Sequence, residues 1–410
     1  MKKYDYWFPK RRFGMFIHWG LYAIPAWHEQ IRGRLNIPRK EYADLAAKFN
    51  PVNFNPDEWI DLAESTGMKY ICFTAKHHDG FCMWDTKFTD FNIMNTPYNK
   101  DVLSMLAERC HARDIGLSLY YSNPDWHHPN AYNPISSHQL KPYPDDEPNQ
   151  GKYLEYVKNQ IEELCSNYGK IISFFWDIPP KIHMPSINDR IRELQPGIMI
   201  NDRGYDEGDY STPEREVPDG KRFVKPTEAC QSVGKQSWGY RVNEDYYTSK
   251  YLMSSIDKTL AMGGNYLLNI GPKADGTIPP EAKKILDEIG DWYHRVKESF
   301  EGAQPSSELM QRDDFLLTRN NNTLYIHLHN DLISTGITLN PVSILPVHAE
   351  ILNTGEKLNV DLDIMPELCH VGGESQEYLH ISNIDVNGLI GEVVILKLVF
   401  DDIEEAFKIK

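Results

Sequence analysis

The sequence predicts an α/β protein with a (β/α)8-like barrel of the TIM type, imperfect in part, followed by a C-terminal antiparallel β-sandwich. Two observations predict the barrel. Seven short runs between residues 13 and 271 are apolar on both faces, and amphipathic segments alternate with them, as in parallel strands covered by helices. A third observation predicts the sandwich: after about residue 304, short alternating runs are separated by Asn, Gly and Asp turns.

The elements of the barrel follow from these runs in chain order. The expected strands are residues 13–20, 69–75, 116–122, 170–177, 198–203, 227–233 and 265–271. The expected helices are residues 55–68, 101–115, 153–169, 254–264 and 279–296. Asn55 and Pro56 form an N-cap and first-turn pair, and Gly169 suits a helix C-terminus. The strands are unevenly spaced, so we expect one helix or strand to be degenerate. No dinucleotide or phosphate-binding glycine motif follows any strand, which disfavours an open nucleotide-binding sheet.

The chain is expected to divide into a catalytic barrel over residues 1–303 and a β-sandwich over residues 304–410. The linker is predicted at residues 302–308. Strands of the sandwich are expected within residues 315–331, 337–342, 348–363, 377–385 and 391–400. The regular alternation along these strands favours a packing role for this domain over a sugar-binding one.

Composition narrows the class of protein. The net charge of −16 argues against nucleic acid or an anionic membrane surface as the partner, since both need basic patches. The six cysteines form no CxxC pair and indicate buried thiols, not a disulfide framework. We see no signal peptide and no apolar run near the roughly 18 residues of a membrane helix. We therefore expect a cytoplasmic protein; the sequence does not indicate its oligomeric state.

Polar and aromatic residues close most of the predicted strands. In a parallel barrel the C-terminal ends of the strands build the active site. Asp177 is the most informative of these residues because it ends "IISFFWD", a run with no other charge. A helix N-cap or an ion pair would also explain it, but Pro179 and Pro180 follow, so no helix begins there.

The histidines His18, His77 and His78 leave two kinds of site open. With a carboxylate they could hold zinc or manganese, although neither H-x-H nor HExxH occurs. Asp79 could then fix a histidine tautomer. Tryptophans near the same strand ends favour a carbohydrate site instead, because aromatic faces stack on sugar rings while polar groups bind the hydroxyls.

Several stretches carry a specific combination of residues. They are "FGMFIHWGLYAIPAWHEQ", "TAKHHDGFCMWDTKFTDFN", "LYYSNPDWHHP", "NDRGYDEGDYSTPE", "SWGY" and "GGNYLLNIGPKADGTIP". In this order they resemble the α-L-fucosidases of glycoside hydrolase family 29, over nearly the whole barrel. The resemblance implies a barrel followed by a β-sandwich and a retaining exo-hydrolase without metal or other cofactor. Its substrate would be a terminal α-L-fucosyl group of an oligosaccharide or glycoconjugate.

The resemblance also implies roles for individual residues. Asp177 would be the nucleophile and Glu214 the general acid/base, with Glu216 and Glu228 as reserve candidates for the acid. The residues implied for fucose binding are His18, Glu29, His77, His78, Tyr120, Arg203 and Trp238. The "DWHHP" stretch is similar to the branch that acts on α-1,3/1,4 linkages. The alternatives are a metal-dependent hydrolase using His18, His77 and His78, and a non-catalytic fucose-binding protein.

The sequence departs from the family pattern at two places. The family commonly has a tryptophan two residues before the nucleophile and a glycine after it, whereas this chain has Phe175 and Ile178. The common "AWGEW" is "AWHEQ" here, so Gln30 replaces an aromatic residue. These changes bear on the preference for the leaving group.

Overall fold

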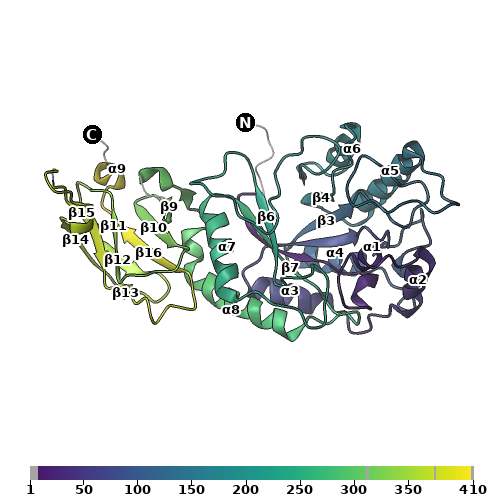
Figure 1. Ribbon diagram of the computed structural model, residues 1–410, viewed down its shortest axis with the longest axis horizontal. Coiled ribbons are helices and arrows are strands. Elements are labelled where there is room, and N and C mark those ends of the chain that lie inside the picture. The colour runs from purple at the N-terminus through teal and green to yellow at the C-terminus, as the bar shows by residue number, and fades with distance from the viewer. Residues whose placement is uncertain (1–7, 311–313, 374, 408–410) are drawn as a thin grey trace. The chain divides into compact units, whose positions relative to one another are not determined.

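A computed structural model describes residues 8–310, 314–373 and 375–407. The chain forms two compact units (Figure 1). The first comprises the chain up to Arg215 together with Lys225–Tyr247 and Asn265–Asp287, and the second comprises Glu216–Val224, Thr248–Gly264 and the chain from Glu288. These units do not follow the chain boundary predicted between residues 303 and 304, and that boundary stays a prediction.

The first unit contains a sheet of seven parallel strands in the order β5-β4-β3-β2-β1-β7-β6. The strands are β1 (Phe13–Ile17), β2 (Tyr70–Lys76), β3 (Gly116–Ser122), β4 (Ser173–Asp177), β5 (Met199–Ile200), β6 (Glu228–Ser232) and β7 (Asn265–Ile270). Each lies within or within one residue of a predicted strand, so the predicted parallel sheet is confirmed. The strand β5 is much shorter than expected.

An irregular segment closes the sheet between its edge strands β5 and β6. On one side Asp209 N–H donates to Ile200 O at 2.6 Å, and on the other Cys230 N–H donates to Pro213 O at 3.0 Å. Isolated bridges join Ser211 to Thr227 and Glu214 to Cys230 in parallel register. The closing segment, residues 209–215, thus stands where an eighth strand would lie, and the barrel is imperfect as predicted.

Alternation along the strands sends every second side chain into the barrel. The interior core takes one or two residues from each strand and is completed by residues outside the strands. Its members are Phe8, Phe16, Tyr70, Cys72, Tyr120, Ile172, Phe175, Met199, Tyr210, Cys230 and Leu267. This core fills the barrel below the C-terminal ends of the strands, so a pocket can form only at that end.

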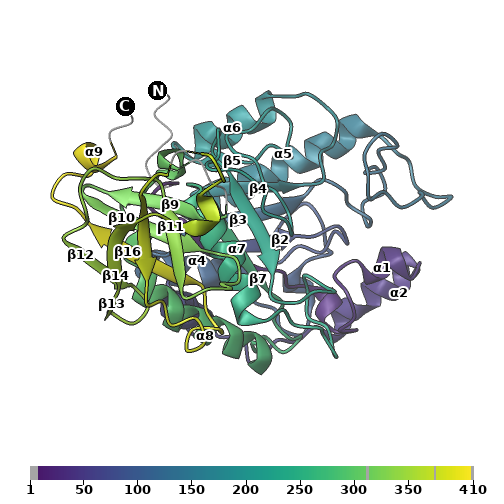
Figure 2. The same ribbon diagram turned by 60° about the vertical axis from the view of Figure 1, so that its left-hand side comes forward.

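Helices follow the strands in the chain. They are α1 (Ile31–Arg34), α2 (Arg39–Ala43), α3 (Pro56–Ser65), α4 (Val102–Ala112), α5 (Gln150–Asn167), α6 (Ser186–Leu194), α7 (Ser249–Ala261), α8 (Pro280–Val296) and α9 (Ile403–Ala406). Asn55 caps α3 by accepting from Asp57 N–H, as its sequence predicts. The helix α6 was not predicted; it lies beside α5 in both views (Figures 1 and 2).

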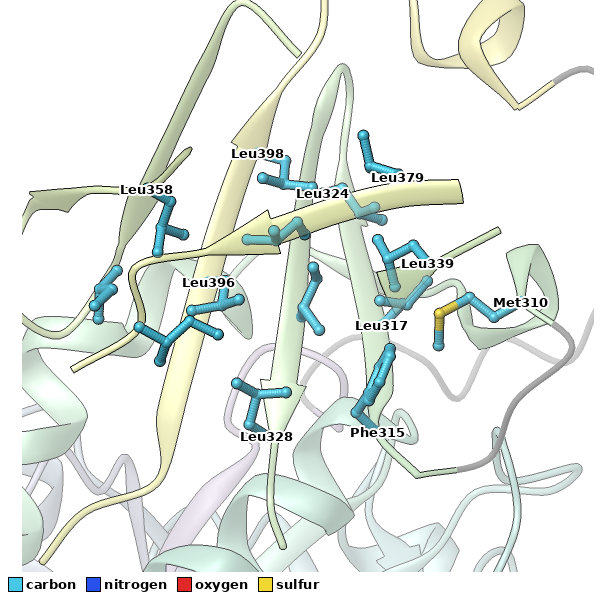
Figure 3. Close-up of a cluster of buried hydrophobic side chains, with 14 of the residues drawn as sticks. Met310, Phe315, Leu317, Leu324, Leu328, Leu339, Leu358, Leu379, Leu396 and Leu398 are labelled. Carbon is cyan, nitrogen blue, oxygen red and sulfur yellow. The ribbon is translucent and has the colours of Figure 1, made fainter. Parts of the chain in front are cut away.

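The second unit contains two antiparallel sheets. Their strands are β8 (Gln304–Pro305), β9 (Leu316–Asn320), β10 (Thr323–Leu328), β11 (Gly336–Leu339), β12 (His348–Ile351), β13 (Glu356–Lys357), β14 (Asn359–Asp363), β15 (Tyr378–Ser382) and β16 (Val394–Val399). One sheet has the order β13-β12-β16-β10-β9-β8 and the other β11-β15-β14. Leucines of both sheets, such as Leu324 and Leu379, gather in one apolar cluster (Figure 3), so the predicted β-sandwich is confirmed.

No helix among the described residues is both long and apolar enough to span a membrane.

Candidate active site

A pocket of about 110 Å³ opens in the first unit at the C-terminal ends of the parallel strands. Its lining includes all nine residues singled out in the sequence. The lining residues are Phe16, His18, Glu29, Gln30, His77, His78, Tyr120, His138, Phe175, Asp177, Ile178, Arg203, Glu214, Cys230 and Trp238. The structure thus brings the nine together, and the role of each is treated below as a proposal.

Asp177 is the last residue of β4, and the pleat of that strand directs its side chain. Phe175 and Asp177 both line the pocket. Trp176 points the other way, where its Nε1–H donates to Asn188 Oδ1 at 2.9 Å. The strand therefore places one carboxylate in the pocket and buries a tryptophan on the helical side.

Several groups hold the Asp177 carboxylate. Tyr120 OH donates to Oδ2 at 2.7 Å, Arg203 Nη1 lies 3.0 Å from Oδ1, and Ile178 N–H donates to Oδ1 at 2.9 Å. Burial opposes ionisation, but His78, Arg203 and the two hydrogen bonds lower the pKa of Asp177 below its usual value. Asp177 is therefore a carboxylate at neutral pH.

Arg203 connects two of the three acidic side chains that line the pocket, Asp177 and Glu214. The same Nη1 atom lies 3.0 Å from Asp177 Oδ1 and 3.0 Å from Glu214 Oε2. Nη2 donates to Thr212 O at 2.8 Å, which ties the guanidinium to the closing segment. Asp177 has a side chain only 14% exposed, whereas that of Glu214 is 41% exposed. One carboxylate is thus enclosed and the other lies at the opening.

His77 and His78 follow β2 in a tight turn that Gly80 completes. Gly80 N–H donates to His77 O at 3.1 Å, and its φ of 84° is a left-handed conformation that favours glycine. The two imidazole rings lie 4.2 Å apart and both line the pocket. Burial lowers the pKa of His78 to about 4 and that of His77 well below its usual value. Both rings are therefore neutral at pH 7.

The expectation that Asp79 fixes a histidine tautomer is wrong. Asp79 Oδ2 accepts from Tyr42 OH at 2.7 Å, and Oδ1 accepts from Phe81 N–H at 3.1 Å. The carboxyl group faces away from the histidines because adjacent side chains in the turn diverge. Burial raises the pKa of Asp79 to about 6 in spite of these two hydrogen bonds.

The tautomer of His78 is set by Ser122 at the end of β3. Ser122 Oγ–H donates to Pro124 O at 2.7 Å, so the hydroxyl oxygen must accept from His78 Nδ1–H, 2.7 Å away. The neutral ring then carries no proton on Nε2, which lies 3.7 Å from Asp177 Oδ2. His78 can accept a hydrogen bond from a ligand hydroxyl beside the carboxylate.

The tautomer of His18 is set in the same way by Asn269. Asn269 Nδ2 donates to Trp238 O at 2.7 Å, which orients the amide and leaves its Oδ1 facing His18 Nδ1 at 2.7 Å. His18 therefore donates from Nδ1 and keeps an unprotonated Nε2. Burial lowers the pKa of His18 to about 4, so this histidine is neutral as well.

Hydrogen bonds hold Glu29 and Trp238 together beside the His18 ring. Glu29 Oε2 accepts from Ser237 Oγ–H at 2.8 Å and from Trp238 N–H at 2.9 Å. Burial opposes ionisation, but nearby His28 and His18 and the hydrogen bond from Ser237 lower the pKa of Glu29. The Trp238 ring lies 5.2 Å from that of His18, and the Arg215 guanidinium lies 4.6 Å above it. The result is a fixed aromatic face beside an ionised carboxylate.

A metal centre lacks support in this geometry. Among the described residues, no group of three or more His, Cys, Asp or Glu side chains is arranged to hold a metal ion. Burial lowers the pKa values of all three histidines and keeps the rings neutral, and hydrogen bonds to Asn269 and Ser122 fix the tautomers of His18 and His78.

Sequence reasoning missed six lining residues. Phe16, Phe175 and Cys230 belong to inward positions of β1, β4 and β6, but these strands are buried on both faces and carry no period-two pattern that would mark the inward side. Gln30 and Ile178 were noted only as departures from a family pattern. His138 lies in the loop between β3 and α5, where no periodic signal exists; its carbonyl accepts from Trp126 Nε1–H at 2.7 Å.

The two reserve candidates for the acid do not line the pocket. Glu228 begins β6 and is fully buried in the barrel interior, where Tyr70 OH donates to its Oε2 at 2.6 Å. Burial raises its pKa to about 7. Glu216 is exposed. Of the three glutamates, only Glu214 lies with Asp177 in the pocket.

A parallel barrel with three acidic side chains, an arginine, neutral histidines and a tryptophan at one pocket is typical of a glycoside hydrolase. The family model described as Alpha-L-fucosidase matches residues 1–298. Human tissue α-L-fucosidase is 30% identical over 331 residues, which cover 73% of this chain and 69% of that protein. The chain therefore belongs to the α-L-fucosidase family, glycoside hydrolase family 29.

Solved structures of the same family share the fold. Alpha-L-fucosidase isoenzyme 1 from Paenibacillus thiaminolyticus has 32% identity and a TM-score of 0.84, over 97% of this chain and 98% of that chain. A family 29 α-L-fucosidase from Bacteroides thetaiotaomicron, trapped as a covalent intermediate with 2-fluoro-fucosyl fluoride, has 26% identity and a TM-score of 0.78. That match covers 95% of this chain and 94% of that chain.

Proposed function

We propose that this protein is a retaining exo-α-L-fucosidase that removes terminal α-L-fucosyl groups from oligosaccharides or glycoconjugates. Asp177 is the nucleophile and Glu214 is the general acid/base. The observation that carries the assignment is the position of Arg203 Nη1, which lies 3.0 Å from an oxygen of each carboxylate.

The separation of the carboxylates supports double displacement. Because both oxygens lie 3.0 Å from one nitrogen, they are at most about 6 Å apart. Retaining enzymes place the two groups about 5–5.5 Å apart, whereas inverting enzymes need about 6.5–9.5 Å to admit a water. The covalent intermediate of the Bacteroides thetaiotaomicron relative agrees with this choice.

The ionised state of Asp177 and the positions of the two groups fit the two roles. Asp177 is ionised and enclosed, so one of its oxygens can attack the anomeric carbon while the bond to the leaving oxygen breaks. Glu214, at the opening, gives its proton to that oxygen. In the second step Glu214 takes a proton from water, whose oxygen displaces Asp177 and releases fucose. Arg203 contacts both carboxylates and balances their charge at each stage.

The remaining pocket residues suit a single terminal sugar. Phe16, Phe175 and Cys230 of the barrel core close the floor of the pocket, so no longer chain can pass. The unprotonated Nε2 atoms of His18 and His78 accept hydrogen bonds from sugar hydroxyls, and Glu29 and Arg203 supply charged partners. Trp238 offers an apolar face to the ring or its methyl group.

For the linkage we propose a preference for α-1,3/1,4-fucosides. Trp126 of the "DWHHP" stretch packs 5.4 Å from the His78 ring and donates to His138 O, so this stretch supports the loop that lines the opening. Initial rates on Lewis-type, 2′-linked and core-fucosylated oligosaccharides test the preference. Faster cleavage of 2′-linked or core-linked fucose would contradict it.

The nucleophile is tested with an aryl α-L-fucoside. Asp177→Ala should abolish turnover, and added azide should restore release of the aryl group with formation of a fucosyl azide of inverted configuration. Incubating the unchanged protein with 2-fluoro-fucosyl fluoride should release the anomeric fluoride and leave a 2-fluoro-fucosyl adduct on the peptide that contains Asp177. Asp202→Ala is a matched control, because Lys225, at 3.6 Å, is the one ion-pair partner of Asp202 among the described residues. Full activity of Asp177→Ala would overturn the proposal, and tight fucose binding without any cleavage by the unchanged protein would favour a binding protein.

A further inference from the structure

Asn123 is a buried residue to which the proposed function assigns no role. It follows the last residue of β3 directly and is 4% exposed. Its backbone N–H donates to Asp177 O at 3.0 Å. Its own carbonyl accepts from Tyr153 OH of α5 at 2.7 Å. Asn123 is thus fixed on both sides before its side chain is considered.

The side-chain amide of Asn123 faces three backbone carbonyls. Nδ2 lies 3.1 Å from Asp177 O, 2.9 Å from Ile178 O and 3.3 Å from Arg203 O. Carbonyl oxygens only accept, so the amide must present its NH2 group to all three, and its two hydrogens are shared among them. One donor group therefore joins the end of β4 to the segment that follows β5.

The backbone that Asn123 holds is strained. Ile178 has a φ of 57°, a left-handed conformation that a β-branched residue seldom adopts. Such a conformation persists only where the surroundings fix it. The shortest of the three Asn123 contacts is to Ile178 O, and Ile178 N–H is the group that donates to Asp177 Oδ1.

We propose that Asn123 is a positioning residue for catalysis: its amide fixes the backbone of Asp177 and of Arg203 relative to each other. This inference rests on the proposed function, in which Asp177 is the nucleophile. Without the amide, the Asp177–Ile178 peptide relaxes, and the carboxylate loses its alignment with Arg203. A displacement of about 1 Å at a reacting group costs roughly 100-fold in rate.

The test compares Asn123→Ala, Asn123→Asp and Asn133→Ala on an aryl α-L-fucoside from pH 4 to pH 9. Asn123→Ala should lose about 100-fold in kcat. The acidic limb of its kcat/KM profile should also move to higher pH, because Asp177 loses its contact with Arg203. Asn123→Asp keeps the shape but turns a carboxylate oxygen towards the carbonyls, so at neutral pH it should be impaired at least as much.

Asn133→Ala is the matched control. Asn133 is also buried, and its Nδ2 donates to Pro180 O at 2.8 Å. The variant therefore loses an amide–carbonyl hydrogen bond that involves neither Asp177 nor Arg203. Its acidic limb should stay in place. Thermal unfolding of each variant separates loss of fold from loss of alignment, and Asn123→Asp carries the test if Asn123→Ala does not fold.

Two outcomes separate this inference from the proposed function. If Asn123→Ala and Asn123→Asp keep the kcat and acidic limb of the unchanged protein while Asp177→Ala is inactive, the positioning role is overturned and the nucleophile stands. If Asp177→Ala is fully active, the proposed function itself fails, and the positioning role fails with it.

Discussion

Arg203 Nη1 lies 3.0 Å from Asp177 Oδ1 at the end of the strand β4. The same guanidinium is anchored by Nη2 to Thr212 O in the segment that closes the barrel. Because Glu214 belongs to that segment, one arginine links the enclosed carboxylate to the exposed one. The imperfect closure of the barrel is therefore what brings the second carboxylate to the pocket.

Replacement of Arg203 by lysine should lower kcat/KM about 100-fold, since a single ammonium group cannot reproduce the fork that contacts both carboxylates and Thr212. The pKa of Asp177 should rise as well, because the shorter lysine side chain cannot donate to the carboxylate from the position of Arg203 Nη1. Steady-state kinetics on an aryl fucoside measure both effects. An unchanged kcat/KM in Arg203→Lys would show that the bridge is not needed for catalysis.

Tyr120→Phe removes the hydrogen bond that Tyr120 OH donates to Asp177 Oδ2 at 2.7 Å. A hydrogen bond to a charged group contributes about 1.5–3 kcal/mol, so the pKa of Asp177 should rise by about one unit or more. Activity needs the ionised carboxylate, and therefore the variant should lose more activity at pH 5 than at pH 7. The pH dependence of kcat/KM gives the result. A parallel loss at both pH values would contradict this reasoning.

Glu214→Ala should affect substrates according to their leaving groups. Aryl fucosides with acidic phenols need little protonation, whereas oligosaccharides need a full proton transfer, and general acid catalysis contributes about 100- to 10,000-fold. We expect the rate of the first step, the transfer of fucose to Asp177, to fall slightly for activated fucosides and strongly for oligosaccharides. Equal losses on both would move the acid role away from Glu214.

Glu228→Gln should change stability more than activity. The folded-state pKa of Glu228 is raised to about 7 by burial, above its unfolded value. As pH rises from about 4.5 to 7, the unfolded state releases its proton first, so this residue makes the unchanged protein less stable. Glu228→Gln should remove this loss, which is worth about 3 kcal/mol in the free energy of unfolding above pH 7. Urea unfolding at several pH values measures the difference. An inactive but folded variant would make Glu228 the acid after all.

Asp125→Ala should destabilise the first unit strongly. Lys76 Nζ lies 3.0 Å from Asp125 Oδ2, and both side chains are buried. Removing one partner of a buried pair costs about 3–5 kcal/mol, and adding Lys76→Met should recover much of it. Burial opposes ionisation of Asp125, but Lys76 and nearby groups lower its pKa to about 2. The pair therefore stabilises the fold above about pH 4 and is lost as pH falls towards 2. Urea unfolding of the single and double variants measures these effects, and equal stability of Asp125→Ala and the unchanged protein would refute them.

The strands of the barrel were predictable, because runs that are apolar on both faces and alternate with amphipathic segments leave a pattern in the sequence. The run that ends at Asp177 is the clearest case: a strand buried on both faces can end in a carboxylate only where that charge is satisfied. The closing segment has no such apolar pattern. Its backbone pairs with β5 at one end and with β6 along its length, and no local propensity encodes this pairing.

The sequence by itself determined which residue types stand at the strand ends, and with them the two carboxylates, the histidines and the family. Only the tertiary structure decided how they act on one another. In the fold, Asp79 accepts a hydrogen bond from Tyr42, the tautomers of His18 and His78 are fixed, and the Asn123 amide donates to three carbonyls. All of these interactions are hydrogen bonds between segments that are distant in the chain. These hydrogen bonds depend on differences in distance of a few tenths of an ångström, which follow from packing and leave no pattern along the chain.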